Sequence, residues 1–457
     1  MRVIRVFLAL AMLVTAMMGC GRSAPSPEYN LEIFATAGGS VTAPGEGSFT
    51  YPPNTVVDLL AEAEEGYRFS SWIGDVSAVA ERYSASTTIT MNRSYSINAT
   101  FAREVRDWHD LHAIRHNLGG IFVLTNNLDS TAAGYEDLAG PGADGGEGWK
   151  PIGSSDPFAA FTGSFDGQGY EIRDLFIYRP DEDSVGLFGL VSEGGIISSV
   201  GIVSADVTGG AGVGCLVGES WGGLVRNSYA DGGVNGNEFV GGLIGMNDLG
   251  TVAGCHSDSN VTGQLYVGGL VGGHWGGTVR DSYSSGNVTG EDGVGGLAGE
   301  NHDGAIHRAY ATGSVTGSWS VGGLVGESHG GSIITTYAKG SITGSVFVGG
   351  LLGYNDGLVQ MSYSAGSVTG DQSVGGLVGQ NGWQGTVSNC FWDTVTSGIE
   401  QSAGGTGKTT AEMQDITTFL DATWDICAVA HGEIDEACIW NIVDSVTYPF
   451  FRWQNRF

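Results

Sequence analysis

Short apolar runs separated by glycine, asparagine, aspartate and serine fill residues 185–390, and they return at a nearly constant interval. A block of the form Val-Gly-Gly-Leu-Val-Gly, or a variant of it, starts at residues 185, 213, 240, 267, 294, 321, 348 and 374, in steps of 26 to 28 residues. No unit shows the 3.6-residue apolar period of a helix. The pattern therefore predicts strands arranged in an internal repeat.

Two further columns keep the phase of this block. One is the apolar-polar-glycine triplet, as in Val261-Thr262-Gly263, and the other is aromatic: Tyr229, His256, Tyr283, Tyr310, Tyr337 and Tyr363. A unit this short cannot bury a core of its own, so the units must stack on one another. We therefore predict an all-β protein containing a parallel β-helix, with three strands and three turns in each coil. Parallel crossovers make it right-handed by default, and the tyrosines form a structural ladder.

Glycine supports this architecture, because 48 of the 79 glycines lie in residues 201–380. We expect glycine where a coil turns sharply with positive φ, or where two backbones pack closely. A strict period of two through the repeated block would place Leu243 on one face and Val240 with Ile244 on the other.

The charge balance limits the range of partners. The chain has 49 acidic and 19 basic residues, a net charge of −30. Such a surface is unsuited to nucleic acid, because phosphate binding requires a basic face. The acids could bind Ca²⁺ weakly, but the glycine-aspartate nonapeptide of calcium-binding β-rolls is absent. No cofactor and no metal site is predicted.

The N-terminus has the pattern of an export signal. Arg2 and Arg5 precede a 13-residue apolar run that is too short to span a membrane, and Gly19-Cys20 follows it. This arrangement resembles a bacterial lipoprotein signal, which implies cleavage after residues 1–19 and lipid attachment to Cys20. Residues 20–29 would then be a tether. The predicted location is the bacterial cell envelope, lipid-anchored in the membrane and exposed at the outer surface, with secretion as the alternative.

Residues 30–103 alternate apolar and polar positions between turn signals, which predicts a small β domain. Three of its segments, Gly38-Gly39-Ser40-Val41, Gly66-Tyr67-Arg68-Phe69-Ser70-Ser71-Trp72 and Ala99-Thr100-Phe101, resemble the divergent internalin-type B-repeat of bacterial surface proteins. The resemblance implies a compact module of surface stalks.

The repeat array also resembles a known family. Val267-Gly268-Gly269-Leu270-Val271-Gly272, followed by Gly277-Thr278-Val279 and Val288-Thr289-Gly290, is similar to the GLUG motif of bacterial surface proteins. The resemblance implies an adhesin or a large secreted surface protein. Some family members sit beside zinc metallopeptidase domains, but this chain lacks their His-Glu-x-x-His motif, so that activity is not expected.

Both ends of the array, residues 185–390, need covers, because an open β-helix end leaves strands unpaired. Residues 104–184 are predicted to hold a capping helix over 107–119 and the first coils. Residues 391–457 are predicted to cap the other end, with a second helix beginning at the capping box Thr409-Thr410-Ala411-Glu412. In an oxidising compartment, Cys427 and Cys438 could close a disulfide loop within this cap.

We expect a surface-anchored extracellular protein that acts in adhesion or in binding a protein or glycan partner, and not an enzyme. Two alternatives stay open: a passive structural component of the envelope or a stalk, and a polysaccharide-active β-helix enzyme. Such an enzyme needs a base beside carboxylates, and the best cluster in the array is Arg280, Asp281 and Asp303. No catalytic residue is predicted.

Overall fold

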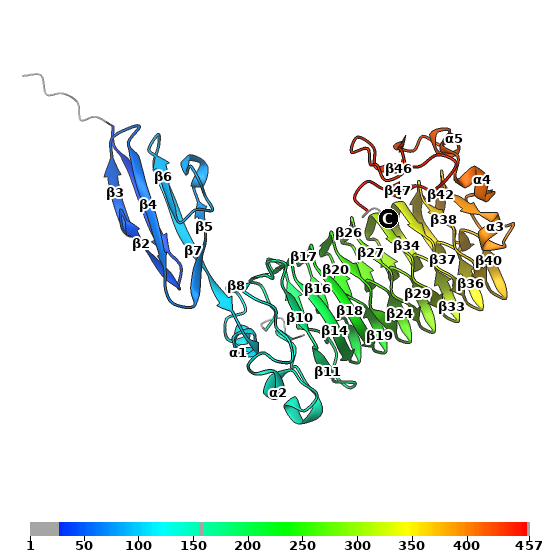
Figure 1. The fold of residues 1–457 in the computed structure, drawn as a ribbon, viewed down its shortest axis with the longest axis horizontal. Coiled ribbons are helices and arrows are strands. Elements are labelled where there is room, and N and C mark those ends of the chain that lie inside the picture. Colours follow the sequence, from blue (N-terminus) through cyan, green and yellow to red (C-terminus); the bar gives the residue numbers. More distant parts are fainter. Residues whose placement is uncertain (1–26, 155–158, 455–457) are drawn as a thin grey trace, which may run out of the picture. The chain divides into compact units, whose positions relative to one another are not determined.

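The computed structural model describes residues 27–154 and 159–454 (Figure 1). The chain forms two compact units, and the first ends at Phe101 in the sequence. The predicted signal, Cys20 and most of the predicted tether lie outside the described residues. Each unit is considered by itself below.

The first unit is a small β domain with two sheets. One sheet joins β1 (Tyr29–Ala35) to β3 (Gly47–Tyr51) and β7 (Tyr95–Val105), and the other is antiparallel, with β2 (Gly39–Ala43), β4 (Val56–Ala63) and β6 (Ser86–Thr90). The remaining elements are β5 (Tyr67–Gly74) and a short 3₁₀ turn, Val76–Ala78. Trp72 is fully buried in the core, and its indole N–H donates to the Ser84 carbonyl oxygen at 3.0 Å.

The second unit is a parallel β-helix in which each coil pairs with the next, about one repeat further along the chain. A separate seven-stranded sheet follows one side of it: β15 (Ala211–Val213), β19 (Glu238–Gly241), β24 (Leu265–Gly268), β29 (Asp292–Gly295), β33 (Trp319–Gly322), β36 (Val346–Gly349) and β40 (Gln372–Gly375). The adjoining side contains β12 (Phe188–Ser192), β16 (Val217–Trp221), β20 (Ile244–Asp248), β25 (Val271–Trp275), β30 (Ala298–His302), β34 (Val325–Ala338), β37 (Leu352–Gln360) and β41 (Val378–Asn381).

Shorter strands complete the coils. The next side contains β13 (Ile196–Ser198), β17 (Leu224–Arg226), β21 (Thr251–Ala253), β26 (Thr278–Arg280), β31 (Ala305–Ala311) and β42 (Thr386–Ser388). The last side contains β14 (Gly201–Thr208), β18 (Tyr229–Asn235), β22 (His256–Ser257), β23 (Asn260–Thr262), β27 (Tyr283–Ser284), β28 (Val288–Thr289), β32 (Val315–Thr316), β35 (Ile342–Thr343), β38 (Tyr363–Ser364), β39 (Val368–Thr369) and β43 (Phe391–Asp393). The fold class predicted from the repeat is confirmed, but a coil such as 238–262 contains five short strands rather than three.

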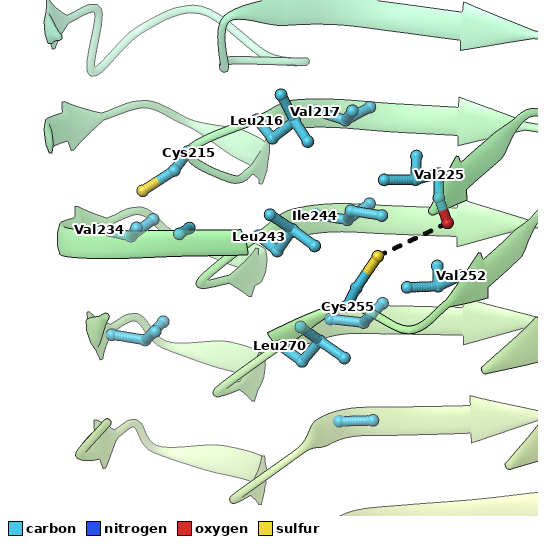
Figure 2. Close-up of a cluster of buried hydrophobic side chains, with 14 of the residues drawn as sticks. Cys215, Leu216, Val217, Val225, Val234, Leu243, Ile244, Val252, Cys255 and Leu270 are labelled. Atoms are coloured by element: carbon cyan, nitrogen blue, oxygen red, sulfur yellow. Dashed lines mark hydrogen bonds between the residues drawn. The ribbon is translucent and has the colours of Figure 1, made fainter. Parts of the chain in front are cut away.

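The repeated block spans a corner of the coil, which corrects the prediction about its two faces. Val240, Leu243 and Ile244 are all fully buried, because the chain turns between β19 and β20 instead of continuing as one strand. Figure 2 shows Leu243 and Ile244 in the same interior as Leu216, Val217 and Leu270 of the neighbouring coils. Alternation by two holds only within a continuous strand, so the corner resets it.

Glycine in this block serves close packing rather than positive φ. A Cβ on Gly268, Gly269 or Gly272 would overlap backbone atoms of the same or the adjacent coil. The left-handed corners fall elsewhere and mostly hold other residues. In the column directly before the repeated block, φ lies between 48° and 64°, at Ser184, Gly212, Phe239, Tyr266, Gly293, Ser320, Phe347 and Ser373. The expectation that sharp turns would be marked by glycine therefore applies to a minority of these corners.

Three cysteines lie in the core of the β-helix. Cys215, Cys255 and Cys390 are buried free thiols, and Cys255 Sγ donates to the Val225 carbonyl oxygen at 3.6 Å (Figure 2). Burial raises the pKa of each of these thiols to about 12. They are therefore packing groups and not reactive nucleophiles.

The N-terminal cover is shorter than predicted. The expected helix over 107–119 divides into α1 (Trp108–His112) and a 3₁₀ turn, Ala113–His116, after Asp107 caps the first turn. Its apolar residues still face the core, where Trp108 packs against Trp149 at 5.7 Å. The first coils contain β8 (Ile121–Leu124), α2 (Tyr135–Leu138), the 3₁₀ turn Ala143–Gly146, β9 (Ser164–Asp166), β10 (Glu171–Arg173) and β11 (Phe176–Tyr178).

The C-terminal region does two jobs where capping alone was predicted. Residues up to β44 (Thr406–Lys408) close the end, with β44 pairing to β43 and the Trp392 indole donating to the Ile399 carbonyl oxygen at 3.0 Å. The later elements are α4 (Thr410–Met413), α5 (Ile416–Leu420), β45 (Ile426–Ala428), β46 (Trp440–Ile442) and β47 (Phe450–Phe451), with α3 (Thr394–Ser397) before β44. This later part packs against the side of the β-helix, in one cluster with Tyr337 and Tyr363.

Candidate functional site

The aromatic column forms a continuous ring stack along one side of the β-helix. Parallel registry places each ring above its equivalent in the next coil. Successive centroids are 4.7–5.0 Å apart and the rings lie within 10° of parallel, in the order Tyr229, His256, Tyr283, Tyr310, Tyr337, Tyr363. Because the ring faces cover one another, the ladder turns ring edges and hydroxyl groups outward.

The ladder passes from a partly exposed surface into a buried one. Tyr229, Tyr283 and Tyr310 are partly exposed, whereas Tyr337 and Tyr363 are almost completely buried. The segment after α4 causes this burial.

Contacts from that segment form a second aromatic layer. Phe451 lies 5.7 Å from Tyr337, and Trp453 lies 5.7 Å from Tyr310. The Tyr363 hydroxyl donates to the Pro449 carbonyl oxygen at 2.6 Å, which fixes the layer to the last rung.

A cleft of about 500 Å³ opens where the ladder passes under this layer. Its volume is in the range of small-molecule sites in proteins. Two parts of the chain that are far apart in sequence supply the lining, the first from the ladder coils and the second from the C-terminal region: Tyr283, Ser285, Tyr310, Thr312, Tyr337 and Lys339, with Gln414, His431, Gly432, Glu433, Val443, Val446, Thr447, Tyr448, Phe450 and Gln454.

The predicted cysteine pair belongs to this site. The structure joins Cys427 and Cys438 in a disulfide, and the loop that it closes carries the lining residues His431 and Glu433. The bond therefore restrains one wall of the cleft. The spacing of the two cysteines suggested a bridge, but only the fold shows what the closed loop covers.

Lys339 is the cationic group of the cleft. Its Nζ lies 4.9 Å from the ring centroid of Tyr337, 5.2 Å from that of Tyr448 and 5.8 Å from that of Tyr363. Among the described residues, no carboxylate lies within ion-pair distance of this ammonium. Burial lowers the pKa of Lys339 to about 8. The repeat pattern did not single out Lys339, because the other repeats have unrelated residues at its position.

Tyr448 connects the cleft to the closed end of the β-helix. Its hydroxyl donates to Asp393 Oδ2 at 2.6 Å, and burial, together with this carboxylate, raises the pKa of Tyr448 to about 12. Asp393 also caps α3 by accepting from the backbone N–H groups of Val395 and Thr396. The wall that holds the ammonium is therefore fixed by partly buried hydrogen bonds.

The acid–base cluster considered from the sequence does not assemble as a site. Asp281 Oδ1 and Oδ2 accept from the Arg308 guanidinium at 2.6 and 2.9 Å, and Arg280 also pairs with Asp281. Asp303 instead pairs with His302, at 3.5 Å. Since Asp281 is engaged by two guanidiniums, which lower its pKa, it is an ion-paired surface group rather than a poised base.

A different set of carboxylates, on neighbouring strands, was missed in the sequence. Glu300 and Glu327 are register partners on adjacent strands. Burial raises the pKa of Asp292, and the negative charge of Glu327 raises it further. Trp275 donates to Glu300 at 2.7 Å, and His329 contacts Glu327 at 3.2 Å. The described residues contain no group of His, Cys, Asp and Glu arranged to hold a metal ion.

Each of the two units matches a known family model. Residues 263–289, 290–316 and 317–343 each match the family model of the GLUG motif. Three successive repeats are GLUG motifs. The first unit corresponds to a divergent InlB B-repeat domain, matched over residues 29–105. Both resemblances drawn from the sequence are thereby confirmed.

Related proteins match parts of the chain. Halomucin of Haloquadratum walsbyi is 37% identical over 138 residues, which are 29% of this chain and 1% of halomucin. A protein of Evansella cellulosilytica provisionally named a Gly-rich membrane protein is 36% identical over 104 residues, which are 22% of this chain and 11% of that protein. The GLUG-containing chain thus spans only a small part of either relative.

A Bacteroides ovatus protein, provisionally named an immunoglobulin A1 protease, has a solved structure that covers 78% of this chain and 93% of its own, with a TM-score of 0.42 and 20% sequence identity. Among the described helices, none has the length and apolar character needed to cross a membrane.

Proposed function

We propose that this GLUG-repeat chain is a cell-surface binding protein, active in adhesion, that holds part of a protein or glycan partner in the cleft beside the tyrosine ladder. The single observation that carries the proposal is the cleft itself, a cavity of about 500 Å³ with an aromatic floor and a disulfide-restrained wall. A passive stalk component does not need a cavity built from two distant parts of its chain.

The names of the relatives support a surface role without enzymatic activity. One relative is called halomucin and the other carries the name of a membrane protein. The net charge of −30 suits an extracellular surface, because self-repulsion opposes association.

The carboxylates Asp292, Glu300 and Glu327 are the observation that favours the polysaccharide-active alternative. One carboxyl with a raised pKa beside others is an arrangement found at acid–base sites. Release of reducing ends from polysaccharides, lost on Glu300→Gln, would support that alternative.

The proposed binding can be tested on glycan and protein arrays with the purified chain lacking residues 1–19. Val446 lines the cleft and is 58% exposed, so Val446→Trp would fill the cavity without disturbing the core. Val395, outside the cleft lining and 66% exposed, gives the matched control Val395→Trp. We expect the parent chain to bind a ligand on the array. Val446→Trp should abolish this binding, and Val395→Trp should retain it. Equal binding by both variants, or no ligand for the folded chain, would refute the proposal.

The proposed location is the outer surface of the bacterial envelope, through lipid attached at Cys20. Fractionation of cells expressing the chain or its Cys20→Ser variant tests this. We expect the parent chain in the membrane fraction and the variant in the soluble or secreted fraction. An unchanged distribution would rule out the lipid anchor.

A further inference from the structure

Among the described residues, the ammonium of Lys339 has no acidic partner within ion-pair distance. Acidic residues outnumber basic ones by 49 to 19, so a partner would be easy to supply. Several other cations of the β-helix do have such a partner: Arg280 and Arg308 contact Asp281, and Lys408 contacts Glu412. Lys339 is held by three tyrosine rings and lines the cavity.

A partly buried cation without a counter-ion is stabilised most by an anionic ligand. Aromatic rings supply part of this stabilisation, but their attraction is weaker than a charge-assisted hydrogen bond to a carboxylate. Lys339 can donate such bonds toward the cavity that it lines. A ligand carboxylate would therefore supply the ion-pair partner that Lys339 lacks among the described residues.

The rest of the lining is largely apolar, with polar groups set among it. Val443, Val446 and Phe450 supply apolar surface for the C–H groups of a sugar ring. Ser285, Thr312, Thr447 and Gln414 place hydroxyl and amide groups around the cavity, and the ladder contributes tyrosine ring edges. Hydroxyl and amide groups both donate and accept, which matches the mixed hydrogen bonding of saccharide hydroxyls. The volume is that of a small-molecule site rather than of a broad protein interface.

We infer that the cleft binds a carboxylate-bearing saccharide, such as a hexuronic acid residue, with its carboxylate on Lys339 and its hydroxyls on the surrounding polar side chains. The inference rests on the proposed function, because it names the class of ligand for the same cleft.

Calorimetric titration tests this with a short oligosaccharide of glucuronic acid and with its carboxyl-reduced glucose counterpart. The reduced probe keeps the sugar ring and lacks only the charge. We expect the acidic probe to bind at least about 10-fold more tightly. Lys339→Met should weaken the acidic probe by about 10- to 100-fold, the range for a hydrogen bond to a charged group, and leave the neutral probe unchanged. The matched control Lys408→Met, outside this cleft, should alter neither.

Proton uptake gives a second readout. An anion beside Lys339 favours its charged form, so binding near pH 8.5 should take up protons and should weaken as the pH rises. The other titratable groups facing the cavity are Tyr283, Tyr310, Tyr337, Tyr448, His431 and Glu433. Lys339→Met should abolish the uptake, whereas His431→Gln should keep it.

The outcomes separate the two proposals. Equal binding of both probes, unaffected by Lys339→Met but abolished by Val446→Trp, would overturn the carboxylate assignment and leave the cleft as a binding site. Binding of an acidic peptide in place of either sugar would overturn the saccharide assignment. If no array ligand binds the folded chain, the proposed function fails, and this inference fails with it.

Discussion

Replacing Lys339 by methionine should stabilise the C-terminal region while it removes the proposed ligand contact. Methionine keeps an unbranched stem among Tyr337, Tyr363 and Tyr448 and removes the charge that burial disfavours. Higher stability together with weaker binding would show that the loss of binding does not come from unfolding.

The size of the effect follows from the pKa of Lys339. Burial lowers it from 10.5 to about 8, which corresponds to a penalty on the folded state of about 3 kcal/mol at neutral pH. The cation–π contacts that the variant loses offset about 1–2 kcal/mol of the gain. We therefore expect Lys339→Met to raise the free energy of unfolding by about 1–2 kcal/mol at pH 7.

The pH dependence has a definite sign. Below pH 8 the lysine is charged in both states and the penalty is complete. Between pH 8 and 10.5 the unfolded chain binds more protons than the folded one, so stability rises with pH and the advantage of the variant shrinks.

Denaturant unfolding at pH 7 and pH 9.5, followed by tryptophan fluorescence, measures this, with Lys408→Met as the control. The reasoning would be refuted if Lys339→Met were no more stable than the parent at pH 7. It would also be refuted if the difference in free energy of unfolding between the two were the same at pH 7 and pH 9.5.

Three further predictions concern the coils and the C-terminal loop. Gly269→Ala should lower the free energy of unfolding by about 1–3 kcal/mol, because the added Cβ would overlap the next coil. Gly233→Ala, with open space around the added Cβ, should leave the melting temperature nearly unchanged. Burial lowers the pKa of His274 to about 4, so between pH 6.5 and 4 only the unfolded chain takes up a proton at this residue, and the parent protein loses stability as the pH falls. His274→Asn should remove this loss. The Cys427→Ser/Cys438→Ser pair should destabilise the C-terminal segment by about 2–3 kcal/mol, seen as faster amide exchange there.

Each of these has a result that would contradict it. Equal melting temperatures for the two glycine variants would mean that the coils can separate without cost. An unchanged difference in stability between pH 7 and 4.5 for the histidine variant would show that this side chain is hydrated in the folded protein. Amide exchange unaltered by loss of the disulfide would show that the aromatic layer alone holds the loop.

The architecture could be predicted because repetition makes spatial neighbours visible in the sequence. Once Tyr283 and Tyr310 occupy the same position in successive units, stacking leaves little freedom for their rings. The same argument fails at the corners. Phe239 and Ser320 adopt positive φ in equivalent places, yet neither residue type signals such a turn.

The cleft could not be predicted, because one of its walls comes from outside the repeat. Trp440 and Phe451 lie in β46 and β47, which form a separate small sheet outside the register of the coils. Their apolar partners, Tyr337 and Tyr363, are indistinguishable in sequence from the exposed rungs. The significance of Lys339 likewise depends on which rungs the segment covers.

Because the coils pair with one another in the same way, the number of coils in the array can change. Removing residues 240–266, one whole unit outside the cleft lining, would bring Val213 and Val267 into the pairing that each now makes with Val240. The stack would shorten by about 4.8 Å while the last coils and the segment over them stayed intact. The coils that line the cleft and the coils before them are thus separate parts of the chain, and the number of the earlier coils can change without altering the cleft.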